Sequence, residues 1–149
     1  MVYIGADHRG FQLKERIKKR LIDEGFEVTD LGNDRLNPAD DYVDYALKVA
    51  EATVTSEENK GILFCGSGAG VDMVANKVPG IRSALVFDTA RAKQAREDED
   101  ANVISLPADV LKEQMAWAVV QTFLQTPFSQ DPRHIRRLGK IEEVEKQYD

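Results

Sequence analysis

The chain has 149 residues, 42% of them hydrophobic and 31% charged, and this length suits one domain over residues 1–149 with a core of its own. The formal net charge of −6 argues against a general nucleic-acid binder, which usually carries a basic surface. A single cysteine cannot form an internal disulfide, and neither a signal peptide nor a bilayer-length apolar run is recognised, so we expect a cytoplasmic protein with no nucleic-acid or membrane partner.

Short apolar runs alternate with amphipathic stretches along the chain, which is the pattern of strands joined by helices. In chain order we expect a strand at 1–6, a helix at 11–24, a strand at 26–31, a helix at 42–54, a strand at 62–65, a helix opening at 71–77, a strand at 82–87, a helix at 89–97, a strand at 102–106, a helix at 107–124 and a charged helix at 134–147. Residues 32–40 are rich in Gly, Asn, Pro and Asp and are expected to be a loop.

Apolar residues recur at helical spacing in these stretches, and their faces are expected to point inward. The inward residues are expected to be Leu13, Ile17, Leu21 and Ile22 in the first helix and Val43, Ala46, Leu47 and Ala50 in the second. Pro107 is expected to open the helix at 107–124, with Val110 and Met115 among its apolar residues.

Five strands separated by helices predict an α/β protein, a three-layer αβα, Rossmann-like domain around a five-stranded parallel sheet. In such sheets, ligands bind beyond the carboxyl ends of the strands. The turn after the first strand contains Asp7 and His8, and the turn after the third contains Cys65. We expect these two turns to lie on one edge of the sheet and to form a functional site there.

The run 61–70 holds the only cysteine of the chain, followed directly by a glycine-rich turn. A thiol between a strand end and a helix start is expected to favour its thiolate, because backbone N–H groups and the helix dipole face it. The same groups would stabilise an oxygen that becomes anionic during a reaction. Cysteines at strand ends are often inert core residues, and glycine loops often serve packing alone. The pattern by itself therefore leaves both a reactive thiol and a purely structural residue open.

Neighbouring residues exclude several chemistries that share a cysteine or a glycine loop. A small cysteine phosphatase needs an arginine six positions after the cysteine, where this chain has Val71. A phosphate-binding P-loop needs a lysine and a hydroxyl residue that GSGAGVDM lacks. One cysteine and two histidines far apart in the sequence argue against zinc.

Several motifs along the chain occur together in one known family. They are the opening run 5–14, Asp41 and Tyr42 ahead of the second helix, the run 61–70, the runs 75–77 and 80–82, Asn102 and Val103, and the late Arg133, His134 and Arg137. In these motifs the chain resembles the family of ribose-5-phosphate isomerase type B and galactose-6-phosphate isomerase. The resemblance covers nearly the whole chain.

The resemblance implies an aldose–ketose isomerase that acts on a sugar phosphate without a metal or organic cofactor. Cys65 as thiolate would take the proton next to the carbonyl, and Asp7 would manage the hydroxyl proton. The remaining implied residues bind the substrate. The enediolate would be held by Ser67 and the amides of Gly66, Gly68, Ala69 and Gly70, and the phosphate by His8, Arg133 and Arg137, with Tyr42 also at the site.

The family builds its site across a subunit interface, so the resemblance implies a homodimer or a dimer of dimers. Three acidic residues depart from the family pattern. Asp98 stands where well-known members have a ring-opening histidine, and Glu99 stands where an asparagine commonly follows it. Asp109 stands where many members have an arginine that helps to bind phosphate. Asp98 or His134 would then open the sugar ring.

The sequence leaves three functions open. The first is isomerisation of ribose 5-phosphate and ribulose 5-phosphate. The second is isomerisation of another sugar phosphate, such as a hexose 6-phosphate or a modified sugar, with Asp98 and Glu99 binding extra hydroxyls. The third is a non-catalytic sugar-phosphate-binding protein, against which the retained Asp7, Cys65 and Ser67 argue.

Overall fold

A computed structural model describes all residues 1–149, and its centre is a sheet of five strands in the order β2-β1-β3-β5-β4. The strands are β1 (Val2–Ala6), β2 (Val28–Asp30), β3 (Lys60–Cys65), β4 (Ser83–Leu85) and β5 (Val103–Pro107). Every neighbouring pair is parallel, so the carboxyl ends of all five strands lie along one edge. The predicted α/β class and five-stranded parallel sheet are confirmed.

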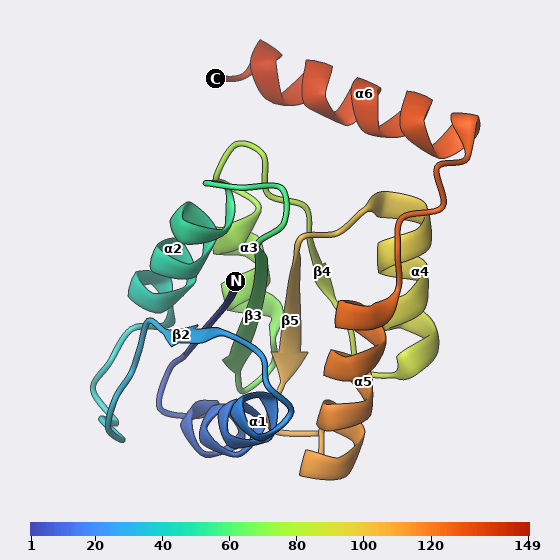
Figure 1. The fold of residues 1–149 in the computed structure, drawn as a ribbon. Coiled ribbons are helices and arrows are strands. Elements are labelled where there is room, and N and C mark those ends of the chain that lie inside the picture. Colours follow the sequence, from blue (N-terminus) through green and yellow to red (C-terminus); the bar gives the residue numbers. More distant parts are fainter.

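Helices cover both faces of the sheet (Figure 1). They are α1 (Phe11–Asp23), α2 (Tyr42–Thr53), α3 (Ala69–Ala75), α4 (Thr89–Glu99), α5 (Glu113–Gln125) and α6 (Pro132–Gln147). One face carries α1, α4 and α5, and the other carries α2 and α3. The sixth helix, α6, buries none of its residues and lies across the top of Figure 1, apart from both layers.

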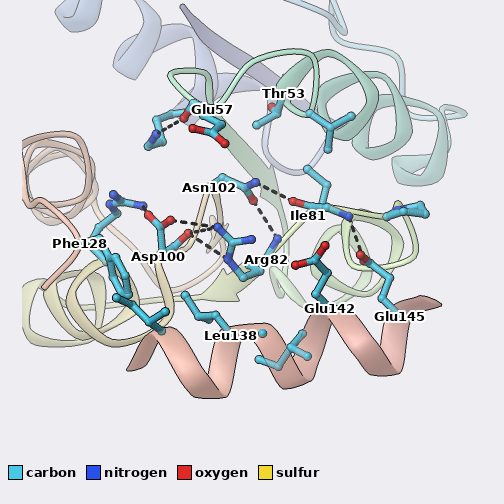
Figure 2. A pocket seen from close by; sticks show the side chains of 18 of the residues that line it. Thr53, Glu57, Ile81, Arg82, Asp100, Asn102, Phe128, Leu138, Glu142 and Glu145 are labelled. Atoms are coloured by element: carbon cyan, nitrogen blue, oxygen red, sulfur yellow. Dashed lines mark hydrogen bonds and ion pairs between the residues drawn. The ribbon is translucent and has the colours of Figure 1, made fainter. Parts of the chain in front are cut away.

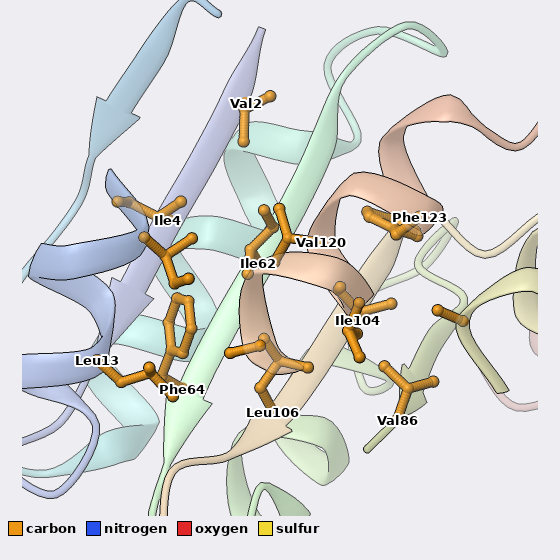
Figure 3. Packing of buried hydrophobic residues seen from close by; sticks show 14 of the residues in the cluster. Val2, Ile4, Leu13, Ile62, Phe64, Val86, Ile104, Leu106, Val120 and Phe123 are labelled. Carbon is orange, nitrogen blue, oxygen red and sulfur yellow. The ribbon is translucent and has the colours of Figure 1, made fainter. Parts of the chain in front are cut away.

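Alternation along the central strands divides the core into two clusters, because successive side chains of a strand point to opposite faces. Ile62 and Phe64 of β3 point to the α1, α4 and α5 side, where they meet Leu106 and Val120 (Figure 3). Leu63 and Cys65 point to the opposite side and pack in the cluster with α2 and α3. The cysteine therefore lies beneath α3, on the smaller of the two clusters.

The prediction that Pro107 opens a helix is wrong. Pro107 ends β5 opposite Cys65, and α5 begins only at Glu113. The intervening turn is hydrogen-bonded to the loop after β3: Ala108 N–H donates to the Cys65 carbonyl at 2.8 Å, and Asp109 N–H to the Gly66 carbonyl at 3.0 Å. These bonds hold the turn after Pro107 against the loop after β3, so the chain does not enter a helix at the proline.

Several residues expected in the core are exposed in the subunit. The exposed fractions are 55% for Ile22, 44% for Val43 and 40% for Leu47, and Val110 lies in the turn before α5 at 73%. The face of α2 that does pack consists of Ala46, Val49, Ala50 and Thr53. That spacing is the ordinary stripe of one helix face, rotated from the predicted one because the small Ala46 and Ala50 approach the sheet most closely.

Gly10 provides a test of how tightly the turn after β1 packs. A Cβ at Gly10 would lie 2.6 Å from the backbone of Phe64, so we expect Gly10→Ala to lower the free energy of unfolding by about 3 kcal/mol. Gly139 on α6 is the matched control, since a Cβ there meets nothing within 4 Å. Urea denaturation of both variants measures the difference, and equal stability of the two would contradict this packing.

Candidate active site

The loop after β3 holds the thiol of Cys65 against a backbone amide. Gly68 N–H donates to Cys65 Sγ at 3.1 Å, and the cysteine is 4% exposed. Gly68 has a φ of +75°, and a Cβ there would lie 2.5 Å from Leu85 and 3.1 Å from the Pro107 nitrogen. Only glycine adopts this conformation here without strain, so Gly68 allows the turn that aims its amide at the sulfur. An N–H in this position is a ready partner for a negatively charged sulfur.

Ser67 and Tyr42 border the same loop. Ser67 is exposed at the tip, and its hydroxyl accepts from Ala69 N–H at 3.2 Å. Tyr42, the first residue of α2, places its ring where a Cβ of Gly70 would be, at 2.7 Å. The glycine at position 70 therefore leaves room for the tyrosine ring against the loop.

The turn after β1 lies directly beside this loop. Asp7 is 5% exposed, and its Oδ1 accepts from the N–H groups of Arg9 at 3.0 Å and Gly10 at 3.1 Å. Gly10 in turn packs on the backbone of Phe64, the residue before Cys65. Asp7, His8 and the Cys65 loop thus occupy adjacent carboxyl ends of β1 and β3, on one edge of the sheet as predicted.

Two residues near this site escaped the sequence analysis. The Asp40 carboxylate accepts from the backbone N–H of His8 and also contacts the His8 ring nitrogen Nδ1. Arg9 lies over Gly66, where its guanidinium occupies the space of a Cβ, and forms an ion pair with Asp109. Asp40 lay within the predicted loop 32–40, and the 9–109 pair joins residues one hundred positions apart, so no spacing pattern could have revealed either contact.

The other predicted site residues lie at the opposite end of the subunit. Because α4 follows β4 and precedes β5, it runs back to the amino edge of the sheet, and Asp98 and Glu99 lie near its end. His134 Nε2 lies 3.7 Å from an Asp98 oxygen, and its Nδ1 contacts the Ser129 hydroxyl at 2.7 Å. In Figure 1, β3 and β5 point downward while α6 lies across the top. One chain therefore does not bring these residues to Cys65.

Arg133 and Arg137 both project from α6 and are exposed. The Arg133 guanidinium bonds to Asp131 at 2.8 and 3.2 Å, and these hydrogen bonds lower the pKa of the Asp131 carboxyl well below its usual range. Arg137 makes no hydrogen bond or ion pair within the chain. Its guanidinium is free to bind an anion supplied from outside the subunit.

A cavity of about 900 Å³ lies between α6 and the amino ends of the strands, away from Cys65. Arg82, Asp100 and Asn102 form one wall and Glu142 and Glu145 of α6 line another (Figure 2). Within the wall, Arg82 Nε donates to the Asp100 carbonyl at 3.2 Å. A single bond from Gly80 N–H to Glu145 at 2.9 Å ties α6 across this space.

A buried cation supports the loop that carries Asp40. The Lys14 side chain is fully buried, and its Nζ bonds to both Asp30 carboxylate oxygens at 2.8 Å and to the Asn33 carbonyl. Burial acts to raise the pKa of Asp30, but hydrogen bonds from Lys14 and Lys18 outweigh it and leave that pKa below its usual value. This ion cluster fixes the end of β2 and the start of the loop.

No group of three or more His, Cys, Asp or Glu side chains is placed to hold a metal ion. None of the helices combines the length and apolar character that a membrane-crossing segment needs.

A thiol, a buried carboxylate and a glycine loop at adjacent carboxyl ends of a parallel αβα sheet define an α/β protein with a site for chemistry on a small ligand. Residues 2–141 match the Ribose/Galactose Isomerase family, and the chain belongs to that family. It is an aldose–ketose isomerase of the sugar-phosphate class, so the predicted enzyme class and the predicted family are confirmed.

Several relatives match this chain over nearly its full length. Ribose-5-phosphate isomerase B of Mycobacterium tuberculosis is 38% identical over 148 residues, covering 99% of this chain and 91% of the relative. The structure of ribose-5-phosphate isomerase B from Clostridium thermocellum superposes with a TM-score of 0.94 at 42% identity, covering 99% of each chain. The Mycoplasma genitalium enzyme with bound ribulose-5-phosphate gives 0.93 at 39% identity, covering 97% of this chain and 95% of that one.

The Arg9–Asp109 pair leads to a prediction about substrate affinity. Both side chains are about half exposed, so Asp109 cancels a positive charge beside the Cys65 loop. We expect Asp109→Asn to lower KM for a dianionic sugar phosphate by about threefold in low salt, with the gain shrinking as ionic strength rises. The control is Glu113→Gln, which breaks the 2.9 Å ion pair with Arg20 at the start of α5. Equal KM changes in both variants would count against a local effect.

Proposed function

We propose that the protein interconverts ribose 5-phosphate and ribulose 5-phosphate through an enediolate, with Cys65 as the base and without a cofactor. The observation that carries this proposal is the contact of Gly68 N–H with Cys65 Sγ, directly beside the Asp7 turn. The Mycoplasma genitalium relative with bound ribulose-5-phosphate supports the choice of sugar.

In this mechanism the Cys65 thiolate removes the proton from the carbon next to the carbonyl and returns it to the neighbouring carbon. The Ser67 hydroxyl and the loop amides donate to the oxygen that becomes negative in the enediolate. Losing one such donor typically costs about 2.7–4 kcal/mol of transition-state stabilisation. Asp7 moves the hydroxyl proton between the two substrate oxygens, and its closeness to the loop through Gly10 supports that role.

Ring opening is assigned to Asp98 together with His134. Their 3.7 Å separation supports a pair in which one group takes the proton of the anomeric hydroxyl and the other gives a proton to the ring oxygen as the ring carbon–oxygen bond breaks. Asp98 is 43% exposed, so it is accessible to a ligand from outside its own subunit.

We further propose that the enzyme is a homodimer, or a dimer of dimers, with each site shared between two copies. The split of the predicted site between opposite ends of one chain supports this, because a two-fold axis can bring the α6 end of one copy to the Cys65 end of the other. The absence of buried residues on α6 and the exposed Val43, Leu47 and Ile141 also support a partner. Arg133 and Arg137 of one copy would then bind the phosphate held by His8 of the other.

A second sugar phosphate remains the alternative, and it rests on the acidic side chains at positions 98, 99 and 109. Glu99 is exposed and Asp98 partly so, and carboxylates of this kind accept hydrogen bonds from additional sugar hydroxyls. A hexose 6-phosphate or a modified sugar offers such hydroxyls. A non-catalytic sugar-phosphate-binding role would leave the thiol–amide contact beside Asp7 without a purpose.

Substrate screening in heavy water separates these functions. The proposal predicts turnover of ribose 5-phosphate with deuterium incorporated at the carbon next to the carbonyl, and none in Cys65→Ala. Turnover of another sugar phosphate in the same panel, without ribose 5-phosphate turnover, would establish the alternative. Binding without exchange for every sugar phosphate would reject isomerase chemistry.

A further inference from the structure

Asp40 lies in a position to control the orientation of His8. Its carboxylate is 3% exposed, whereas the His8 side chain is 33% exposed. The same oxygen, Oδ1, accepts from His8 N–H at 3.0 Å and lies 2.8 Å from His8 Nδ1. One carboxylate oxygen thus contacts the backbone and the ring of the histidine at once, and these two contacts favour this ring orientation.

The chemistry of the pair fixes where the proton of the ring lies. An ionised carboxylate only accepts hydrogen bonds, so the Nδ1 in contact with it must be the nitrogen that carries hydrogen. The remaining nitrogen, Nε2, is the one that Asp40 does not contact, on a side chain that is one third exposed. When the ring is protonated, Nε2–H becomes a second donor, and the carboxylate balances the positive charge.

We propose that Asp40 is a positioning residue that keeps hydrogen on Nδ1 of His8 and directs Nε2 toward the phosphate of the substrate, to which Nε2–H donates when the ring carries both hydrogens. The substrate half of this inference rests on the proposed function, but the tautomer half does not. Asp7, the neighbouring carboxylate, makes no hydrogen bond to the ring, and its Oδ1 accepts instead from the N–H groups of Arg9 and Gly10.

The loop around Asp40 is anchored so that its carboxylate stays in place. Asp40 N–H donates to the Asn37 carbonyl at 3.1 Å, and Asn33 Nδ2 lies 3.4 Å from Asp40 Oδ2. Asn33 N–H in turn donates to the Ala6 carbonyl at 3.1 Å, at the end of β1. The loop that carries Asp40 is therefore hydrogen-bonded to the strand that leads into His8.

The test uses the fact that the chain has only two histidines, His8 and His134. In a His134→Gln background, imidazole ¹⁵N–¹H NMR reports His8 alone and shows which nitrogen carries hydrogen. We expect Nδ1–H in the parent and a majority of Nε2–H in Asp40→Ala. Asp40→Asn keeps an oxygen acceptor and should restore Nδ1–H, whereas Asp34→Ala, an exposed acidic residue of the same loop, should change nothing.

Inorganic phosphate then serves as the probe for the anion. We expect Asp40→Ala to weaken the phosphate-induced shift of the His8 signal and to raise KM about tenfold with little change in kcat. In a His8→Gln background, Asp40→Ala should add no further loss, because the two residues act through one contact. A neutral His8 ring with hydrogen at Nε2 and none at Nδ1 in the parent protein, or additive effects of the two substitutions, would overturn the proposal.

These outcomes are independent of the sugar. If ribose 5-phosphate is not turned over, the proposed function fails, while the tautomer and the phosphate titration still decide the role of Asp40. An unchanged phosphate response in Asp40→Ala would overturn the positioning role even if the enzyme isomerises ribose 5-phosphate.

Discussion

Replacing Cys65 by alanine is expected to lower kcat for sugar-phosphate isomerisation by about 10³, because a positioned general base typically contributes 10² to 10⁴. KM should change little, since the phosphate and hydroxyl contacts of the substrate lie on other residues. The side chain is buried beside Gly68 N–H, so removing one sulfur leaves the loop backbone in place. Initial rates and single-turnover deuterium exchange both measure the loss.

Cys65→Ser is the matched control for that result. Serine keeps the size and hydrogen-bonding capacity of the side chain but is far harder to ionise, so it should be nearly as inactive as alanine. The free energy of unfolding of the serine variant should stay within about 1 kcal/mol of the parent. A serine variant that retains most of its activity would mean that the proton is taken by another group, and Asp7 would be the next candidate.

The fold could be predicted from the sequence because its strands are short, apolar and buried. Ile62 and Phe64 face one cluster and Leu63 and Cys65 the other, which is the period of two that a central strand imposes. The parallel arrangement of the strands is what placed Asp7 and Cys65 on one edge of the sheet. The prediction at Pro107 was wrong because proline is tolerated both at the start of a helix and at the end of a strand. Only the pairing of Pro107 with Cys65 of β3 decides between the two.

The contacts around the site depend on tertiary structure in a way that a sequence pattern does not encode. Asp40 reaches His8 across thirty-two positions, through a loop with no periodic order. Arg9 reaches Asp109 only because the turns after β1, β3 and β5 converge. Local spacing predicts which end of a strand carries a side chain, but it does not predict which side chain from another loop will meet it.

The direction of the chain through α4 explains why the predicted site residues lie at two ends of one subunit. Each helix between parallel strands returns the chain to the amino edge, so residues late in α4 must lie far along the sheet from residues that follow a strand. Asp98 and Glu99 are late in α4, and Cys65 ends β3. Loop movement in one chain cannot close that gap, and a second copy in the opposite orientation can.

Mixing two inactive variants tests this arrangement with a large expected effect. Cys65→Ala lacks the base, and Arg137→Ala lacks a guanidinium that has no partner in its own chain. If each site takes Cys65 from one copy and Arg137 from the other, a mixed dimer contains one intact site and one doubly defective site. Subunit exchange of equal amounts should therefore restore about a quarter of the parent activity, since half of the dimers are mixed and each has one working site.

The control mixture pairs Cys65→Ala with Ser67→Ala, whose two substituted residues lie on the same loop and so in the same half-site. Mixed dimers of that pair hold no intact site and should stay as weak as their parents. Arg136→Ala, a neighbouring exposed arginine, should retain most activity on its own, which separates the loss of one phosphate contact from a general loss of charge on α6. Restored activity in the control mixture, or none in the test mixture after exchange is verified by mass, would place the complete site within a single chain.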